Sequence, residues 1–429
     1  MTNDINTAGN PGLQANPRSQ AVRWQIAGLV ILSLLAFLPR LAMLPGNNLD
    51  LIDHFLPWLE SIRTQGFWAA IATPFSRYGY TPFYSYTLGL ADALFPAGTD
   101  GKVVIKSVSI LFDYITAGIM FLIARMRWPQ GNIPLLAYGA VLFAPTVLLN
   151  SAWWGQSDIV YSSFLLACMA ALFAQRPVLA MLAFGVACAI KLQAAWLGPF
   201  ILLMALRGEI RWWSFALIPL TYIVIAVPSL AAGRSLVEVL TIYLTQAGTQ
   251  TAYSHGAPNL LMLLDYAVRG QLLAKEHLAW LSKVLILIAA AASLWFAMRG
   301  RTAGTRKLDA ETLLVAALVS TLLVPSLLPH MHNRYFFPAD ILSIALAVWI
   351  PRYWPVAVSI QAASFFAYIY WVFGTWMLAQ PVPPVLDWIF TNNLQPVTGL
   401  QLLAGFINAG LLIFLWRNME IRLHHHAAR

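Results

Sequence analysis

Long apolar runs, separated by short tracts of arginine and lysine, dominate the sequence of 429 residues. Residues 26–43, 281–298 and 313–328 carry at most one charged residue each, and a helix needs about 20 apolar residues to cross the hydrocarbon core of a bilayer. Only 10% of all residues are charged, whereas a soluble domain has about 25%. The sequence therefore excludes a soluble enzyme and predicts a polytopic, all-α membrane protein.

The net charge of +9 comes from cations that lie between the apolar runs. Examples are Arg125 with Arg127, Arg207 with Arg211, and the tract at residues 299–307. Short basic tracts beside membrane helices are typical of cytoplasmic loops, as the positive-inside rule states. The charge thus indicates a topology, and we expect membrane lipids rather than nucleic acid as partners.

The apolar runs predict about 12 transmembrane helices, within a range of 10 to 13. The expected spans are residues 24–45, 103–125, 132–149, 158–174, 178–191, 192–206, 213–231, 280–298, 311–328, 337–350, 353–372 and 399–416. If both termini are cytoplasmic, the basic tracts fall on the inner side, provided that residues 81–97 do not cross. That run is short and contains Asp92 and two prolines, so we expect it to lie on, or dip into, the outer face.

We expect one membrane domain at residues 24–417, between a disordered cytoplasmic tail at 1–23 and a second cytoplasmic tail at 418–429. The first outer loop, residues 46–102, mixes aromatic and charged residues in the manner of amphipathic juxtamembrane helices. The larger loops, and with them any chemistry, are expected on the outer face.

Carboxylates at the membrane edge are costly and are therefore candidate functional groups. Asp50 and Asp53 directly follow the first span; either could take a proton from an attacking hydroxyl as a general base or could cap the next helix. Asp158 ends the polar cluster "NSAWWGQSD" and is open to the same two interpretations. Asp113, inside the second span, is expected to pair with a polar partner or to line a cavity.

Cations near the outer edge are candidate phosphate ligands. Lys191 interrupts an apolar hairpin and either snorkels or faces a lipid headgroup. In "LLPHMHNRYFFPAD", Arg334 is the kind of forked donor that phosphate prefers, or else forms an interfacial anchor with Tyr335. Asn259 could bind a sugar or cap a helix, and the cap is the favoured interpretation. No carboxylate-rich cluster or metal-binding motif supports a metal site.

Five segments in order, "LDLIDHFLPWLESIRTQGFWAAI…FSRYGYTPFYSYTLGL", "WWGQSDIVYSSFLL", "AFGVACAIKLQAAWLGPF", "APNLL" and "MHNRYFFPAD", resemble bacterial membrane glycosyltransferases of the GT-C superfamily. The resemblance is to the branch related to the eukaryotic GPI-anchor mannosyltransferases. It implies inverting transfer of a monosaccharide, mannose or another hexose or pentose, from a polyprenyl-phosphate donor. The acceptor would be a hydroxyl of a glycolipid, glycan or protein at the periplasmic face of a bacterial inner membrane.

The resemblance also implies roles for individual residues. Asp50 matches the catalytic base, with Asp53 as the alternative, and Asp158 matches the second acid. The residues expected near the donor phosphate are Lys191, His332 and Arg334. Those expected to contact substrate are Tyr80, Trp154, Gln156 and Asn259. A monophosphate donor leaves no diphosphate to neutralise, so no cofactor and no obligatory metal ion are expected.

Two other functions also fit the sequence. A transporter or flippase of a lipid-linked sugar would also need an amphiphile cavity and buried charges such as Asp113 and Lys191. A polysaccharide polymerase or ligase would use a diphosphate-linked glycan instead of a monophosphate.

Overall fold

The computed structural model describes residues 17–74, 80–248, 254–268, 275–301, 307–378 and 399–428. The α-helices are α1 (Pro17–Met43), α2 (Leu56–Gln65), α3 (Phe67–Ala72), α4 (Pro82–Leu94), α5 (Gly101–Arg127), α6 (Ile133–Leu142), α7 (Pro145–Leu148), α8 (Asp158–Phe173), α9 (Pro177–Ile190), α10 (Gly198–Leu206), α11 (Leu217–Ala231), α12 (Leu236–Gly248), α13 (Leu260–Ala267), α14 (Lys275–Arg301), α15 (Ala310–Leu327), α16 (Phe337–Trp349), α17 (Trp354–Leu378) and α19 (Gly399–Ala428).

Short helical turns and one pair of strands complete the described chain. The π-helical turns are η1 (Leu51–Phe55) and η2 (Leu149–Trp153). The 3-10 turns are η3 (Leu192–Leu197), η4 (Trp212–Ala216), η5 (Asn333–Phe336) and η6 (Pro351–Tyr353). Strands β1 (Ser254–His255) and β2 (Met331–His332) pair in parallel, with His255 opposite His332.

Each expected span coincides with a helix or with a pair of consecutive helices. Among the described residues, six helices are long and apolar enough to cross a membrane. Helix α6 and the segment Pro145–Trp153 pass the same test only as a pair, bent by 43° at the break between them. Others, such as α8 and α9, are apolar but shorter. The polytopic, all-α class is confirmed.

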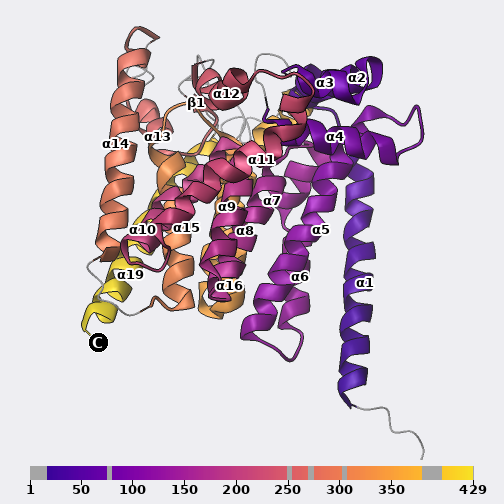
Figure 1. Ribbon diagram of the computed structural model, residues 1–429. Helices are drawn as coiled ribbons and strands as arrows, with labels where there is room; N and C mark the ends of the chain where they lie inside the picture. The colour runs from indigo at the N-terminus through magenta and orange to yellow at the C-terminus, as the bar shows by residue number, and fades with distance from the viewer. Residues whose placement is uncertain are drawn as a thin grey trace, which may run out of the picture.

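The two ends of the helical bundle differ in structure (Figure 1). Helices α2, α3, α4 and α12 and strand β1 gather at the end of the molecule where α1 finishes. The described C-terminus lies at the opposite end, where α1 begins. The run at residues 81–97 forms the 13-residue helix α4. This helix packs against α2 and α3 at the end of the bundle and does not run along its length.

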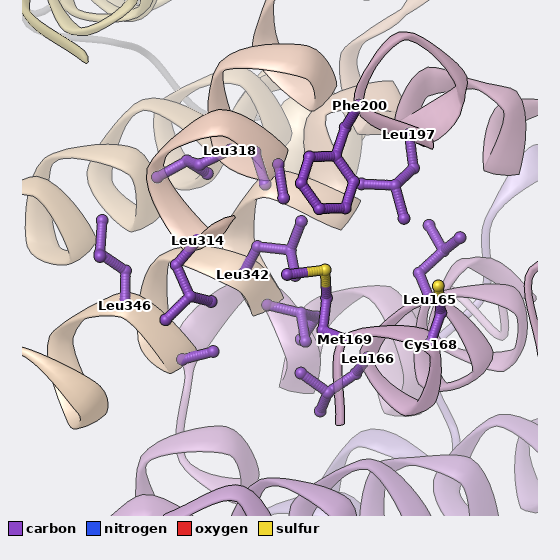
Figure 2. Close-up of a cluster of buried hydrophobic side chains, with 14 of the residues drawn as sticks. Leu165, Leu166, Cys168, Met169, Leu197, Phe200, Leu314, Leu318, Leu342 and Leu346 are labelled. Atoms are coloured by element: carbon purple, nitrogen blue, oxygen red, sulfur yellow. The ribbon is translucent and has the colours of Figure 1, made fainter. Parts of the chain in front are cut away.

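The hydrophobic core is a cluster of buried apolar side chains, most of them from helices in the middle and the later part of the chain. Helix α15 lies at its centre, since every side chain from Thr312 to Ser326 is buried. Figure 2 shows leucines of α8, α15 and α16 pointing toward Phe200 of α10 and Met169 of α8. A helix that is apolar on all sides is buried in the core of a large protein or in a membrane.

A buried ion pair joins α1 to α5. The Arg40 guanidinium donates to the Asp113 carboxylate over 2.9 Å, and both side chains are completely buried. The Ser151 hydroxyl donates to the same Asp113 oxygen over 2.6 Å. Asp113 thus has the polar partner expected for it. The ion pair connects α1 to α5, and the hydrogen bond from Ser151 connects η2 to α5.

We predict that Arg40→Met lowers the unfolding temperature in detergent markedly, because it leaves the Asp113 carboxylate buried without its cation. Breaking a buried pair typically costs about 3–5 kcal/mol. The double variant Arg40→Met/Asp113→Asn should recover much of this loss. A single variant as stable as the wild type would show that the pair does not hold α1 in place.

Candidate active site

A cavity of about 680 Å³ lies between η1 and α2, the residues just before α4, the start of η3, α14 and the segment that precedes α16. It is at the end of the bundle that carries β1 and α2 to α4 (Figure 1). Its charged and imidazole side chains are Asp50, His54, Lys191, His255, Lys283, His330, His332 and Arg334. Apolar and aromatic residues form most of the remaining wall, which is typical of a small-molecule site.

Asp50 is a partly exposed carboxylate held by three donors. Its Oδ2 accepts hydrogen bonds from Trp154 Nε1 over 3.0 Å and from Gln156 Nε2 over 2.6 Å. Arg334 lies 3.3 Å from the same oxygen, and the Asp50 side chain is 30% exposed. Asp50 makes no helix-capping bond. Because these contacts all use Oδ2, Oδ1 is the oxygen that can accept a proton.

Asp158 begins α8 and lies behind the cations of the cavity, with a fully buried side chain. Lys191 Nζ is 2.5 Å from its Oδ1. Asn150 Nδ2 donates to its Oδ2 over 3.0 Å, and Arg334 Nε is 3.6 Å from that oxygen. Asp158 does not line the cavity, so this carboxylate can orient Lys191 and Arg334 without contacting a ligand there.

Arg334, on η5, lies between the two carboxylates and over the Trp154 ring, 5.2 Å from its centroid. Burial alone would lower the pKa of the Arg334 guanidinium, but Asp50 and Asp158 outweigh burial and raise it above its ordinary value. The guanidinium is therefore a permanent cation at the cavity wall.

Two imidazoles stack where β1 meets β2. The His255 and His332 rings are parallel, with centroids 4.2 Å apart. Burial lowers the pKa of both side chains, and the nearby Arg334 cation lowers it further. Both rings are therefore neutral near pH 7, and His332 would meet a phosphate as a hydrogen-bond donor rather than as a charge.

Residues 78–325 match the family model for glycosyltransferase family 87. The chain belongs to glycosyltransferase family 87. The crystal structure of ArnT from Cupriavidus metallidurans bound to undecaprenyl phosphate is similar in fold, with a TM-score of 0.54. The two sequences are 15% identical, and the alignment covers 94% of this chain and 78% of ArnT. No curated protein matches the sequence.

The expected membrane glycosyltransferase is thus confirmed at the level of family and fold. The structure brings six of the sequence-predicted site residues of this family 87 enzyme to one cavity. These are Asp50, Tyr80, Gln156, Lys191, His332 and Arg334.

The other predicted site residues lie outside the cavity wall. Trp154 donates a hydrogen bond to Asp50 from outside the wall. Asp158, also outside the wall, pairs with Lys191 and Arg334. Asp53 is exposed to solvent and is not part of the wall. Asn259 caps α13, since its Oδ1 accepts a hydrogen bond from the Met262 amide over 2.9 Å. For Asn259 this geometry agrees with the cap interpretation.

Sequence reasoning missed Lys283 and the neighbouring Ser282, which line the cavity from α14. The Ser282 hydroxyl lies 3.0 Å from His330 Nε2. The available signal was a lysine inside an otherwise apolar span, at residues 280–298. Within the described parts of the chain, no group of three histidine, cysteine or acidic side chains is arranged to hold a metal ion.

We predict that the enzyme loses stability as the pH falls below about 6.5, the ordinary pKa of histidine. The lowered pKa values of His255 and His332 mean that the unfolded chain binds more protons than the folded one in this range. The contribution of these two histidines to the free energy of unfolding is fully present above about pH 6.5 and is lost as the pH falls below that value. The unfolding temperature measured from pH 8 to pH 5 checks this.

The double variant His255→Asn/His332→Asn should show a smaller acid decline than the wild type. The control His424→Asn, at an exposed position on α19, should keep the wild-type decline. An unchanged decline in the double variant would exclude the stacked pair as its source.

Proposed function

We propose that this family 87 enzyme transfers a monosaccharide from a polyprenyl-phosphate donor to a hydroxyl of a glycolipid, glycan or protein, with inversion at the anomeric carbon. The observation that carries the proposal is the pairing of one accessible carboxylate, Asp50, with the Arg334 cation, 3.3 Å away in the same cavity. A base and a phosphate ligand are the two groups that this reaction requires. The fold shared with ArnT, whose structure holds undecaprenyl phosphate, supports the donor class.

In the proposed reaction, the acceptor oxygen attacks the anomeric carbon from the side opposite the phosphate. The new glycosidic bond forms as the bond between carbon and phosphate oxygen breaks, and that bonding pair leaves with the phosphate. Asp50 Oδ1 takes the proton of the acceptor hydroxyl, as a general base does. Trp154 and Gln156 hold Oδ2 and so orient the free oxygen.

The departing phosphate gains negative charge and needs fixed cations in a site shielded from water. Arg334 supplies a guanidinium that is charged at every relevant pH, and Lys191 lies on the same wall. When phosphate binds Arg334, it competes with Asp50 for the guanidinium and so weakens the pairing that holds the base. The proposal includes no metal ion, because these side chains supply the positive charge.

We also propose that the cavity opens on the extracytoplasmic face of a bacterial inner membrane, with both termini in the cytoplasm. The basic tracts support this orientation through the positive-inside rule. The described C-terminus and the start of α1 lie at the end of the bundle opposite the cavity (Figure 1).

We predict that Asp50→Asn lowers the rate of sugar transfer by about 10²–10⁴-fold, the usual contribution of a general base. The amide is similar in size but cannot take the proton. The measurement is release of polyprenyl phosphate by the purified enzyme, reconstituted with labelled polyprenyl-phosphate sugar and acceptor.

The matched control is Asp53→Asn, which removes a carboxylate three residues away that lies outside the cavity wall. It should keep activity near that of the wild type. Full activity in Asp50→Asn, or loss of activity in Asp53→Asn alone, would overturn the assignment of the base.

A further inference from the structure

Lys106 is a completely buried lysine on α5 that has no role in the chemistry above. Its ammonium donates to three main-chain carbonyls, those of Met43, Leu44 and Gly46, over 3.0, 3.0 and 2.8 Å. An ammonium group has three donors, so these contacts use its full capacity. The ammonium therefore binds one segment of backbone.

The three carbonyls belong to the end of α1 and the turn after it. The last carbonyls of a helix lack intrahelical partners and carry the negative end of the helix dipole, so a cation there satisfies both. The chain reaches Asp50 four residues after Gly46. Lys106 thus fixes the point from which the segment carrying the proposed base departs.

Asn48 connects this segment to the one that holds Asp50. Its Nδ2 donates to the Trp154 carbonyl over 3.0 Å, and its Oδ1 accepts from the Leu51 amide over 2.9 Å. Gly46 lies against the Trp153 ring so closely that a Cβ would come within 2.8 Å of it. The two segments are therefore packed backbone to side chain, with little room to shift.

The same face of α5 also holds the second segment. Ser109, one turn after Lys106, donates to the Gln156 carbonyl over 2.6 Å, and Gln156 in turn binds Asp50 Oδ2. Asp113, one further turn along, accepts from Ser151 and pairs with Arg40. Residues at i, i+3 and i+7 lie on one face of a helix. Lys106, Ser109 and Asp113 thus form a polar stripe in an apolar helix.

We propose that this stripe on α5 positions the catalytic base, with Lys106 as the positioning residue for Asp50. The inference rests on the proposed role of Asp50 and adds a residue that does not contact substrate. Because a displacement of about 1 Å can cost a factor of about 10² in rate, releasing the turn at Met43 to Gly46 should lower turnover. Donor binding should be preserved, since Asp158 still pairs with Lys191 and Arg334 when Asp50 is displaced.

The test is Lys106→Met, which keeps the length of the side chain and removes the ammonium. We expect kcat for sugar transfer to fall about 10- to 100-fold, while the donor KM stays within about twofold. The matched control is Lys102→Met, four residues earlier on α5, where the lysine is partly exposed and pairs with Asp100. It should leave kcat and KM unchanged.

Ser109→Ala is the second variant, because Lys106→Met could fail to fold. It removes one hydrogen bond to the segment that holds Asp50 and should lower kcat by about 10-fold at unchanged donor KM. Wild-type kcat in both variants, or a parallel loss of kcat and donor affinity in a folded variant, would overturn the positioning role. Full activity in Asp50→Asn would instead overturn the base itself.

Discussion

The arrangement of the site depends on one guanidinium that is shared by two carboxylates. Arg334 lies 3.3 Å from Asp50 and 3.6 Å from Asp158, and Lys191 completes the set on the far side of Asp158. Two anions and two cations balance, so none of these charges lacks a counter-ion, which would be strongly destabilising. Of these two carboxylates, Asp50 lines the cavity and Asp158 does not, so one acid is accessible and the other supports the cations.

The helical bundle brings these charges together from distant parts of the chain. The start of η1, the start of α8, the break between α9 and η3, and η5 each contribute one charged side chain. Breaks in helices are where side chains and backbone can turn toward a cavity inside a membrane protein. The polar stripe on α5 binds both the turn after α1 and the Trp154–Gln156 segment, and so fixes their relative positions.

The helical framework could be predicted from the sequence because a backbone in lipid must satisfy its own hydrogen bonds, and apolar runs therefore form helices. The proximity of Asp50, Asp158, Lys191 and Arg334 could not be derived from spacing, since it depends on long-range packing. Resemblance to a family suggested these residues, and the fold shows which of them meet.

Some residues stand in sequence patterns that allow more than one role, and only the structure distinguishes between those roles. Asp50 and Asp53 differ by three positions, and only the π-helical turn η1 shows that the first lines the cavity and the second does not. Lys106 stands near the start of an expected span, where a lysine usually snorkels to the interface. Its carbonyl partners lie some 60 residues away, beyond the reach of any local pattern.

Cleavage of a monophosphate-linked donor is tested most directly by the identity of the lipid product. Purified protein in liposomes would receive a single polyprenyl-phosphate sugar and an acceptor extract, and the lipids would be resolved by mass spectrometry. We predict free polyprenyl monophosphate and a glycosylated acceptor of inverted anomeric configuration. Activity only with diphosphate-linked donors, or transfer of the intact lipid between leaflets without cleavage, would contradict it.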